Sequence, residues 1–180
     1  MAQTKRISRT LDLPIGQVWE IVTSEVFLTT TEKMVDAGNT EIENGSREVE
    51  ADGKVRAHAE IVRAEDEEEG VPELRTHQDS IISTVTGEVG QREFDLTSDL
   101  PLPGNIGKVE TRYHFTEDVH VPGGGETDGS EGERVARTKV EAVVEVSCKL
   151  PFVGKKLEDN VIENSEKTVD NSLERIRRFS

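Results

Sequence analysis

The chain has 180 residues, of which 33% are hydrophobic, 4% aromatic and 33% charged, and its formal net charge at pH 7 is −15. This length suits a single domain, residues 1–180, with a modest and mainly aliphatic core. So acidic a surface repels phosphate backbones and anionic bilayers, which argues against nucleic-acid and membrane-surface partners.

Cysteine content and hydropathy narrow the setting further. Cys148 is the only cysteine, which excludes an internal disulfide and a zinc site built from several cysteines. The N-terminal segment lacks the apolar run of a secretory signal, and no stretch approaches the ~20 apolar residues that span a bilayer. We therefore expect a cytoplasmic protein without membrane insertion.

The chain opens with one predicted strand and two predicted helices. Residues 5–13 alternate between apolar and polar side chains, and Arg9 falls on the apolar face of that strand. Residues 14–22 have the apolar spacing of a helix. A second, weaker helix is predicted for residues 24–35, where three threonines lower helix propensity and packing of Val26, Phe27 and Met34 would have to stabilise it.

From residue 39 the apolar period changes to two, which indicates antiparallel strands. Asp52-Gly53 predicts a tight hairpin turn, whereas Asn44-Gly45 is compatible with either a turn or a bulge. Further strand character is predicted over residues 55–61, about 80–96, 106–116 and 136–150. An acidic run at residues 65–70 and a glycine-rich acidic loop at 121–133 separate some of these strands.

The closing segment predicts one long helix over residues 154–179. Apolar residues fill slightly more than half of its circumference, and charged residues fill the rest. A helix of this length can cross a sheet and cover it. The order of elements therefore predicts an α+β fold, with an antiparallel sheet of about six or seven strands and the helices on one face.

Four small polar residues interrupt the apolar arc of that helix: Asn164, Ser165, Thr168 and Ser172. Two interpretations remain open. The side chains could bond back to carbonyls of the preceding turn, which would allow close packing on the sheet. Alternatively, they could line a partly hydrated cavity between the helix and the sheet.

Glu158 also falls in the apolar arc, within the first turns of the closing helix, where the helix dipole favours a carboxylate. Arg9 occupies the inward phase of the first strand. We hypothesise that these two residues form a polar pair at one end of the cavity; separate contacts with solvent are the alternative.

Three segments resemble a known superfamily: "LPIGQVWEIVTSEVF" after the first strand, "DGKVRAHAEIV", and the closing "LPFVGKKLEDNVIENSEKTVDNSLERI". They resemble, in order and spacing, the START-like or SRPBCC helix-grip superfamily, which includes the birch-pollen-allergen fold. The closing segment is most similar to an actinobacterial START-like family of unknown function. The resemblance implies a curved antiparallel sheet wrapped around a long C-terminal helix, with a cavity between them.

Members of that superfamily bind lipids, sterols, polyketides or plant hormones, and some are cyclases or hydrolases. The resemblance therefore implies a cavity for an apolar or amphipathic small molecule, smaller than a sterol because the chain has only five Phe, one Tyr and one Trp. Combining it with the helical and strand phases gives these candidate lining residues: Trp19, Phe27, Tyr113, Phe115, Val144, Val146, Leu157, Val161, Asn164, Ser165 and Thr168.

Two other functions stay open at this stage. One is a non-catalytic interaction module with a filled core, whose protein partner the sequence does not indicate. The other, less favoured, is a cyclase- or hydrolase-like enzyme, for which Arg9, Glu158 and Tyr113 are the only nominees. The sequence predicts no catalytic constellation, metal site or cofactor, since its histidines and glycines lack the spacing of known motifs.

Overall fold

The computed structural model describes residues 2–36, 38–63, 74–120, 135–151 and 153–180. Its elements are, in order, β1 (Gln3–Leu11), α1 (Ile15–Val22), α2 (Glu25–Thr29), β2 (Thr40–Val49), β3 (Val55–Arg63), β4 (Leu74–Ile82), β5 (Glu93–Pro101), a short 3-10 helix (Pro103–Asn105), β6 (Gly107–His120), β7 (Val135–Cys148) and α3 (Val153–Phe179). The predicted segments 65–70 and 121–133 lie outside the described residues.

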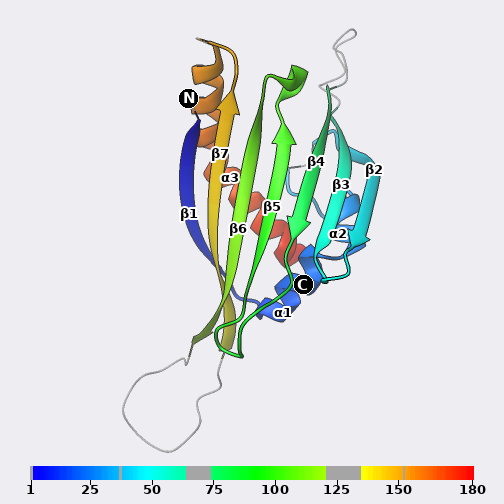
Figure 1. Cartoon of the computed structure of the whole chain (residues 1–180), viewed down its shortest axis with the longest axis vertical. Helices are drawn as coiled ribbons and strands as arrows, with labels where there is room; N and C mark the ends of the chain where they lie inside the picture. The colour runs from blue at the N-terminus through cyan, green and yellow to red at the C-terminus, as the bar shows by residue number, and fades with distance from the viewer. Residues whose placement is uncertain (1, 37, 64–73, 121–134, 152) are drawn as a thin grey trace, which may run out of the picture.

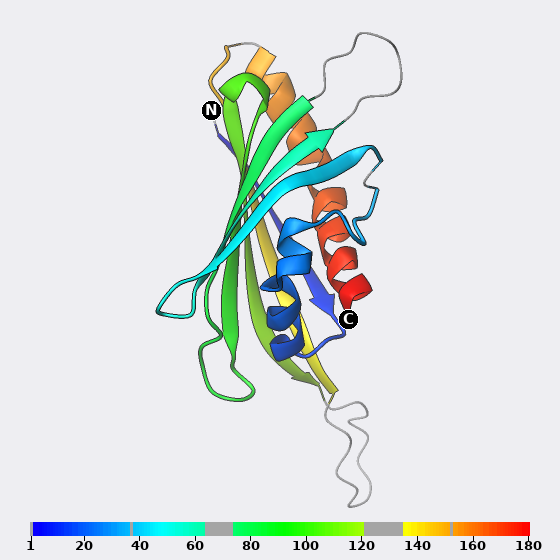
Figure 2. The ribbon, with the colours of Figure 1, turned by 90° about the vertical axis from the view of Figure 1, so that its right-hand side faces the viewer.

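The strands form one seven-stranded sheet in the order β1-β7-β6-β5-β4-β3-β2 (Figure 1). Each neighbouring pair is antiparallel. The sheet curves, and all three helices lie on its concave side (Figure 2). This arrangement confirms the predicted α+β fold, with a sheet wrapped around a long C-terminal helix and two short helices after the first strand.

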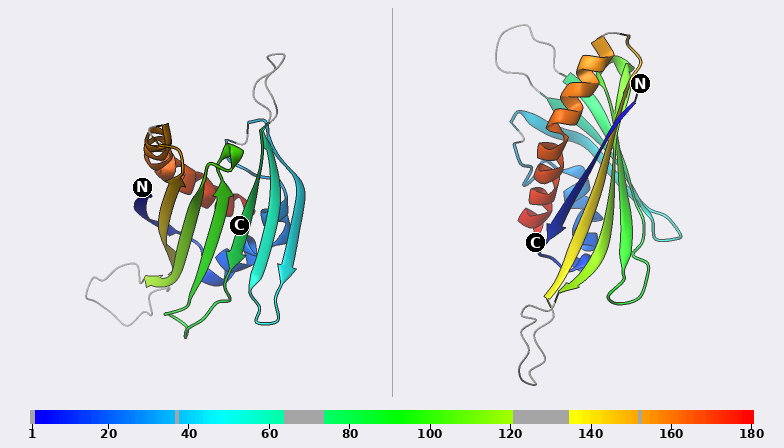
Figure 3. Two further views of the ribbon diagram at one scale, coloured as in Figure 1. Left: turned by 45° about the horizontal axis from the view of Figure 1, so that its top comes forward. Right: turned by 90° about the vertical axis from the view of Figure 1, so that its left-hand side faces the viewer.

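Helix α3 is one continuous rod of 27 residues, about 40 Å long at ~1.5 Å per residue. It runs beside β7 and β1 and then crosses the concave side of the central strands (Figure 3). Its buried positions follow helical spacing: Gly154, Glu158, Ser165, Val169, Leu173 and Ile176. The sequence-based bounds of 154–179 are therefore confirmed to within one residue.

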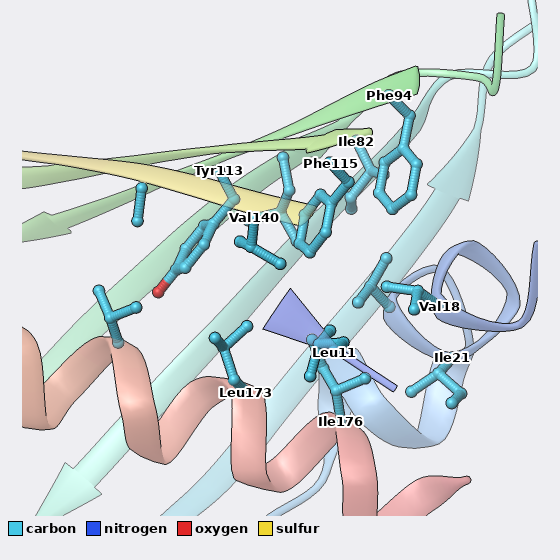
Figure 4. Packing of buried hydrophobic residues seen from close by; sticks show 14 of the residues in the cluster. Leu11, Val18, Ile21, Ile82, Phe94, Tyr113, Phe115, Val140, Leu173 and Ile176 are labelled. Atoms are coloured by element: carbon cyan, nitrogen blue, oxygen red, sulfur yellow. The ribbon is translucent and has the colours of Figure 1, made fainter. Parts of the chain in front are cut away.

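The core joins the C-terminal half of α3 to α1 and the sheet (Figure 4). Leu173 and Ile176 of α3 face Leu11 at the end of β1, and all three are almost fully buried. The rings of Phe94 and Phe115 stack with their centroids 4.5 Å apart. Most other members of the cluster are aliphatic, as the low aromatic content predicts.

The predicted second helix, residues 24–35, is far shorter than expected, since α2 ends at Thr29. The threonines explain the early stop. Thr29 and Thr30 donate their hydroxyls to the carbonyls of Glu25 and Val26 at 2.8 and 2.6 Å, and Thr30 is already extended. Val26, expected to pack inward, is instead 43% exposed.

The strand predicted over residues 80–96 is in fact two strands. β4 ends at Ile82 and β5 begins at Glu93. Between them Gly87 and Gly90 both have positive φ, of 92° and 91°, which favours glycine and ends a strand. The alternation of apolar residues on both sides of this turn concealed the break.

Both glycine dipeptides in the β2–β3 region are explained by the structure. Asp52-Gly53 forms the β2–β3 turn, where Gly53 has φ 83°. The bulge falls at Glu43, immediately before the Asn44-Gly45 dipeptide, because the β2–β3 register skips that residue. A Cβ on Gly45 would lie only 2.3 Å from the Cβ of Thr29. Glycine therefore lets the end of α2 lie directly on β2.

This close approach predicts opposite effects for two Gly→Ala substitutions. Gly45→Ala forces α2 away from β2 and should lower the free energy of unfolding by about 1–3 kcal/mol. Gly16→Ala, where a Cβ would meet no atom within 4 Å, should raise it by roughly 0.5 kcal/mol through its better helix propensity. Urea unfolding of both variants measures the difference, and an unaffected Gly45→Ala would contradict the tight contact.

The β4–β5 turn is held by a buried carboxylate. Glu117 of β6 has a side chain only 2% exposed. It accepts hydrogen bonds from the backbone N–H of Gly90 at 2.6 Å and from the guanidinium of Arg92. Hydrogen bonding to Arg92 is the main reason that the pKa of Glu117 falls to about 2, and the bond from Gly90 adds to the effect.

The lowered pKa of Glu117 predicts an acid-sensitive contribution to stability. It is complete above the unfolded-state pKa of about 4.5 and is lost as the pH falls toward about 2. At neutral pH, Glu117→Gln should therefore cost about 1–3 kcal/mol in unfolding free energy, and the deficit should shrink as the pH falls through that window. Glu20→Gln, on the exposed side of α1, is the control. A deficit independent of pH would contradict the assignment.

Candidate functional site

A cavity of about 360 Å³ lies between α3, the α2–β2 region and the concave face of the sheet. Its helical wall comes from the C-terminal half of α3, from Thr168 to Ile176. Strands β2 to β6 form the opposite wall, and residues of α1, α2 and the segment after α2 close the side. The volume is within the ~300–1,000 Å³ typical of small-molecule sites.

The cavity wall is mainly apolar with a polar band. On the sheet, the apolar part includes Ala57, Ala59, Ile61, Leu96, Leu100 and Val109, and the polar part consists of Gln78, Ser80, Ser98 and Thr111. On α3, Thr168, Asn171 and Ser172 face this band across the cavity. The arrangement can therefore surround an apolar body while offering hydrogen bonds on two sides.

Four of the eleven predicted lining residues lie in the cavity wall: Phe27, Tyr113, Phe115 and Thr168. The other seven are Trp19, Val144, Val146, Leu157, Val161, Asn164 and Ser165, and the described wall does not include them. Trp19 lies against the core instead and donates its indole N–H to the carbonyl of Ser83 at 3.0 Å.

The other six residues were predicted to line the cavity for one shared reason. The first half of α3 contacts β7 and β1 directly, so Val144 and Val146 are buried in packed core, 3% and 0% exposed. Leu157 and Val161 lie on that same half of the helix. The cavity opens only where α3 crosses the concave side of the central strands. The helical periodicity predicted which face of α3 points toward the sheet, but it did not predict which half of the helix lines the cavity.

Both interpretations of the polar residues on α3 hold, for different reasons. Ser165, Thr168 and Ser172 donate their hydroxyls to carbonyls three or four residues earlier, at 2.7, 3.2 and 3.0 Å. Asn164 is exposed and donates to the carbonyl of Asn160 at 2.9 Å. Back-bonding therefore accounts for all four, while Thr168 and Ser172 additionally line the cavity.

The predicted Arg9–Glu158 pair does not form. Arg9 does point toward α3, but its Nε lies 2.7 Å from the carboxylate of Asp170. Glu158 is buried, and one of its carboxylate oxygens accepts a hydrogen bond from the backbone N–H of Cys148 at 2.9 Å. It therefore fixes the end of β7 to the start of α3, and neither residue belongs to the described cavity wall.

Tyr113 is the buried hydroxyl of the cavity wall. Figure 4 shows its ring standing on β6 with the oxygen directed toward α3. Burial raises the pKa of Tyr113, and a hydrogen bond shared with Ser172 partly opposes that shift. The phenol is therefore neutral near pH 7 and can donate or accept a hydrogen bond inside the cavity.

Sequence reasoning missed the one cationic residue in the described cavity wall, Arg175. Burial lowers the pKa of its guanidinium to about 10, so it stays charged at neutral pH. A signal was available, because Arg175 follows Thr168 by seven residues and therefore shares its face of the helix. Gln78 and Ser98 of the polar band were missed because they lie outside the single strand predicted over residues 80–96.

The described residues contain no group of three or more His, Cys, Asp or Glu side chains placed to hold a metal ion. No helix in the same part of the chain is both long enough and apolar enough to cross a membrane.

The curved sheet, the C-terminal helix across it and the cavity between them define a helix-grip protein. Over residues 6–179 the chain matches a family described as "Protein of unknown function (DUF2505)", and it belongs to that family. No curated protein matches it.

Solved structures support the fold. The crystal structure of Ara h 8.0201 is 14% identical, with a TM-score of 0.50, over 99% of this chain and 97% of that chain. A point mutant of norcoclaurine synthase from Thalictrum flavum, in complex with a transition-state analogue, is 12% identical, with a TM-score of 0.50, over 99% of this chain and 96% of that chain. At such low identity these likenesses define the fold alone.

Tyr113 gives a spectroscopic test of the cavity wall, because it is the only tyrosine in the chain. In the folded protein its ultraviolet tyrosinate band should appear well above the pH of about 10 at which a free tyrosine ionises. In urea the same band should appear near that value. Because its folded pKa is raised, Tyr113 should also make the fold less stable as the pH rises above about 10. Titration at the ordinary value in the native state would contradict its burial.

Proposed function

We propose that this protein binds an apolar or amphipathic small molecule in the cavity between α3 and the sheet. The observation that carries the proposal is the cavity itself, about 360 Å³ in volume, with apolar walls and hydrogen-bonding groups on two sides. At ~30 Å³ per water-sized unit of liquid, this space suits a ligand of roughly a dozen non-hydrogen atoms.

Binding would be driven by transfer of the ligand's apolar part from water to the aliphatic wall. Each buried CH₂ group contributes about 0.8 kcal/mol, or roughly a fourfold gain in affinity. The hydroxyls of Thr168 and Ser172 already satisfy their own hydrogens within α3. Their oxygens retain acceptor capacity, so they can orient a ligand without being left unpaired in its absence.

The two other functions have less support. Among the three residues nominated for catalysis, Tyr113 lines the cavity, whereas Arg9 and Glu158 have structural partners elsewhere. An interaction module would be favoured by an exposed apolar patch of more than a few hundred Å². Among the described residues, the exposed large apolar side chains are distributed over α2, β2, β4, β6, β7, the start of α3 and the segments near residues 89 and 150, so they do not favour one docking face.

Three further expectations from the sequence remain predictions. We propose that residues 1–180 act as one domain, that the protein works in the cytoplasm, and that its family is actinobacterial. Interaction with nucleic acid is not expected, because the net charge of −15 opposes it.

A cavity-filling substitution tests the proposed function. Ala59 of β3 lines the cavity, and Ala59→Phe should fill much of it. 1-Naphthylamine, a fluorophore of roughly a dozen non-hydrogen atoms that is uncharged at neutral pH, should bind the natural protein with a blue shift of its emission. The variant should bind the fluorophore with at least tenfold lower affinity. Its free energy of unfolding should stay within about 1 kcal/mol of that of the natural protein, since a filled void restores packing contacts.

Ala51→Phe provides the matched control, because Ala51 is exposed in the β2–β3 turn. It should bind the fluorophore like the natural protein. Native mass spectrometry of freshly purified protein adds a test without a chosen probe. If no small molecule is retained and the fluorophore does not bind, the proposed function is wrong. Equal binding by Ala59→Phe would place the probe elsewhere and also contradict it.

A further inference from the structure

Arg175 lies on the last turns of α3, where the cavity meets the segment that follows α2. Its guanidinium carbon stands 4.5 Å from the centroid of the Phe27 ring and 5.6 Å from that of Phe179. One terminal nitrogen donates to the carbonyl of Thr30 at 2.6 Å, and longer bonds of 3.4 Å reach the carbonyl of Glu32. The guanidinium is thus held in position by two aromatic rings and two backbone carbonyls.

What Arg175 lacks is an anion. Among the described residues, no Asp or Glu forms an ion pair with it, although the chain has 37 acidic residues and only 22 Lys and Arg. Neighbouring cations on α3 do have such partners: Lys167 pairs with Asp36, and Arg177 with Glu174. Asp36, which also contacts α3 through Asn171, is itself 61% exposed and already paired.

The cavity does not supply the missing charge either. Its described lining residues include no Asp, Glu, Lys or His, so Arg175 is the only charged group among them. A guanidinium has five N–H donors in a planar fork, and the carbonyls of Thr30 and Glu32 occupy two of its nitrogens, Nε and one Nη. The other Nη has no acceptor among the described residues. Burial of the guanidinium, which removes water from around it, is what lowers the pKa of Arg175.

We propose that the ligand of this cavity is an amphipathic anion, a small carboxylate with an apolar chain, whose carboxylate pairs with Arg175. This inference rests on the proposed function and adds the chemical class of the ligand. The apolar chain would lie along the aliphatic wall formed by Leu96, Leu100 and Val109. A carboxylate matches the remaining Nη of Arg175, because a hydrogen bond between two charged groups is shorter and roughly twice as strong as one between neutral groups.

The acidic surface does not prevent such binding. Repulsion between the ligand and surface carboxylates is screened beyond a Debye length of ~8 Å at physiological ionic strength. Within the cavity the only charge on the described wall is positive, and the lower dielectric there strengthens a direct ion pair. The global charge would therefore slow association, while the local charge would determine which ligand stays bound.

The structure also offers a purely structural alternative, in which Arg175 serves only to tie α3 to the segment after α2. A matched control separates the two roles. Arg178, three residues later, also donates to a backbone carbonyl of that segment, Met34 at 3.2 Å, but it is exposed and not part of the described cavity wall. Loss of a tie to this segment is common to both residues, whereas loss of cavity charge is specific to Arg175.

The test compares two probes of the same chain length, decanoate and decan-1-ol, which have roughly the dozen non-hydrogen atoms that the cavity accommodates. Binding is measured at neutral pH by displacement of 1-naphthylamine, below the concentrations at which the probes aggregate. The natural protein should bind decanoate at least about tenfold more tightly than decan-1-ol, since hydrogen bonds to a charged group are the stronger kind. Decylamine, cationic at this pH, should bind most weakly.

Arg175→Met should reduce decanoate affinity about tenfold or more and leave decan-1-ol affinity within about twofold, because the apolar stem of the side chain is kept. Arg175→Lys should fall between, since it keeps the charge but loses the planar guanidinium that Thr30 and Glu32 hold in position. Arg178→Met should change neither affinity. If Arg175→Met does not fold, the decanoate preference of the natural protein and the Arg175→Lys variant still decide the matter.

Two failures are distinguishable. If decan-1-ol binds the natural protein as tightly as decanoate, or if Arg175→Met weakens both probes equally, the anionic ligand is wrong while the proposed cavity function stands. If the natural protein binds neither probe nor the fluorophore, the proposed function itself is wrong, and the inference about Arg175 falls with it.

Discussion

The packing of α3 along one side of the curved sheet determines where this protein can hold anything. Its first half contacts β7 and β1 directly, and polar contacts follow the same line: Gln3 with Asp159, Lys5 with Glu166, and Arg9 with Asp170, at 2.7 to 2.9 Å. Such partly exposed pairs contribute at most about 1 kcal/mol each. Burial of Val169, Leu173 and Ile176 contributes about 1.5–3 kcal/mol each, so apolar packing holds the helix and the polar contacts set its alignment.

The cavity follows from this docking. The sheet curves away from the straight rod beyond β7, and the space that opens is closed by α1, α2 and the segment after α2. Short side chains on the facing strand, Ala57 and Ala59, leave the space unfilled. The early end of α2 contributes as well, because Met34 and Val35 then reach the cavity from a segment of turns rather than from a helix.

The polar groups of the site are of two kinds. The hydroxyls of Thr168 and Ser172 bond within their own helix, so they tolerate either an empty or an occupied cavity. Arg175 is different, because it is held by Thr30, Glu32 and two rings but has no carboxylate among the described residues. The described site therefore holds one unpaired, partly desolvated cation in a chain of net charge −15, so it favours a ligand of negative charge. For that reason the chemical class of the ligand can be argued, while its identity is left to experiment.

The sequence by itself determined the order of elements, the antiparallel sheet, the Asp52-Gly53 turn and the single closing helix, because periodicity and turn chemistry are local properties. It also placed Phe27, Tyr113, Phe115 and Thr168 at the cavity. Only the tertiary structure decided that Arg9 pairs with Asp170 rather than Glu158, and that the cavity lies under the second half of α3 beside Arg175. Helical phase gives the direction of a side chain around the axis, but where the sheet curves away from the helix depends on contacts between residues far apart in sequence.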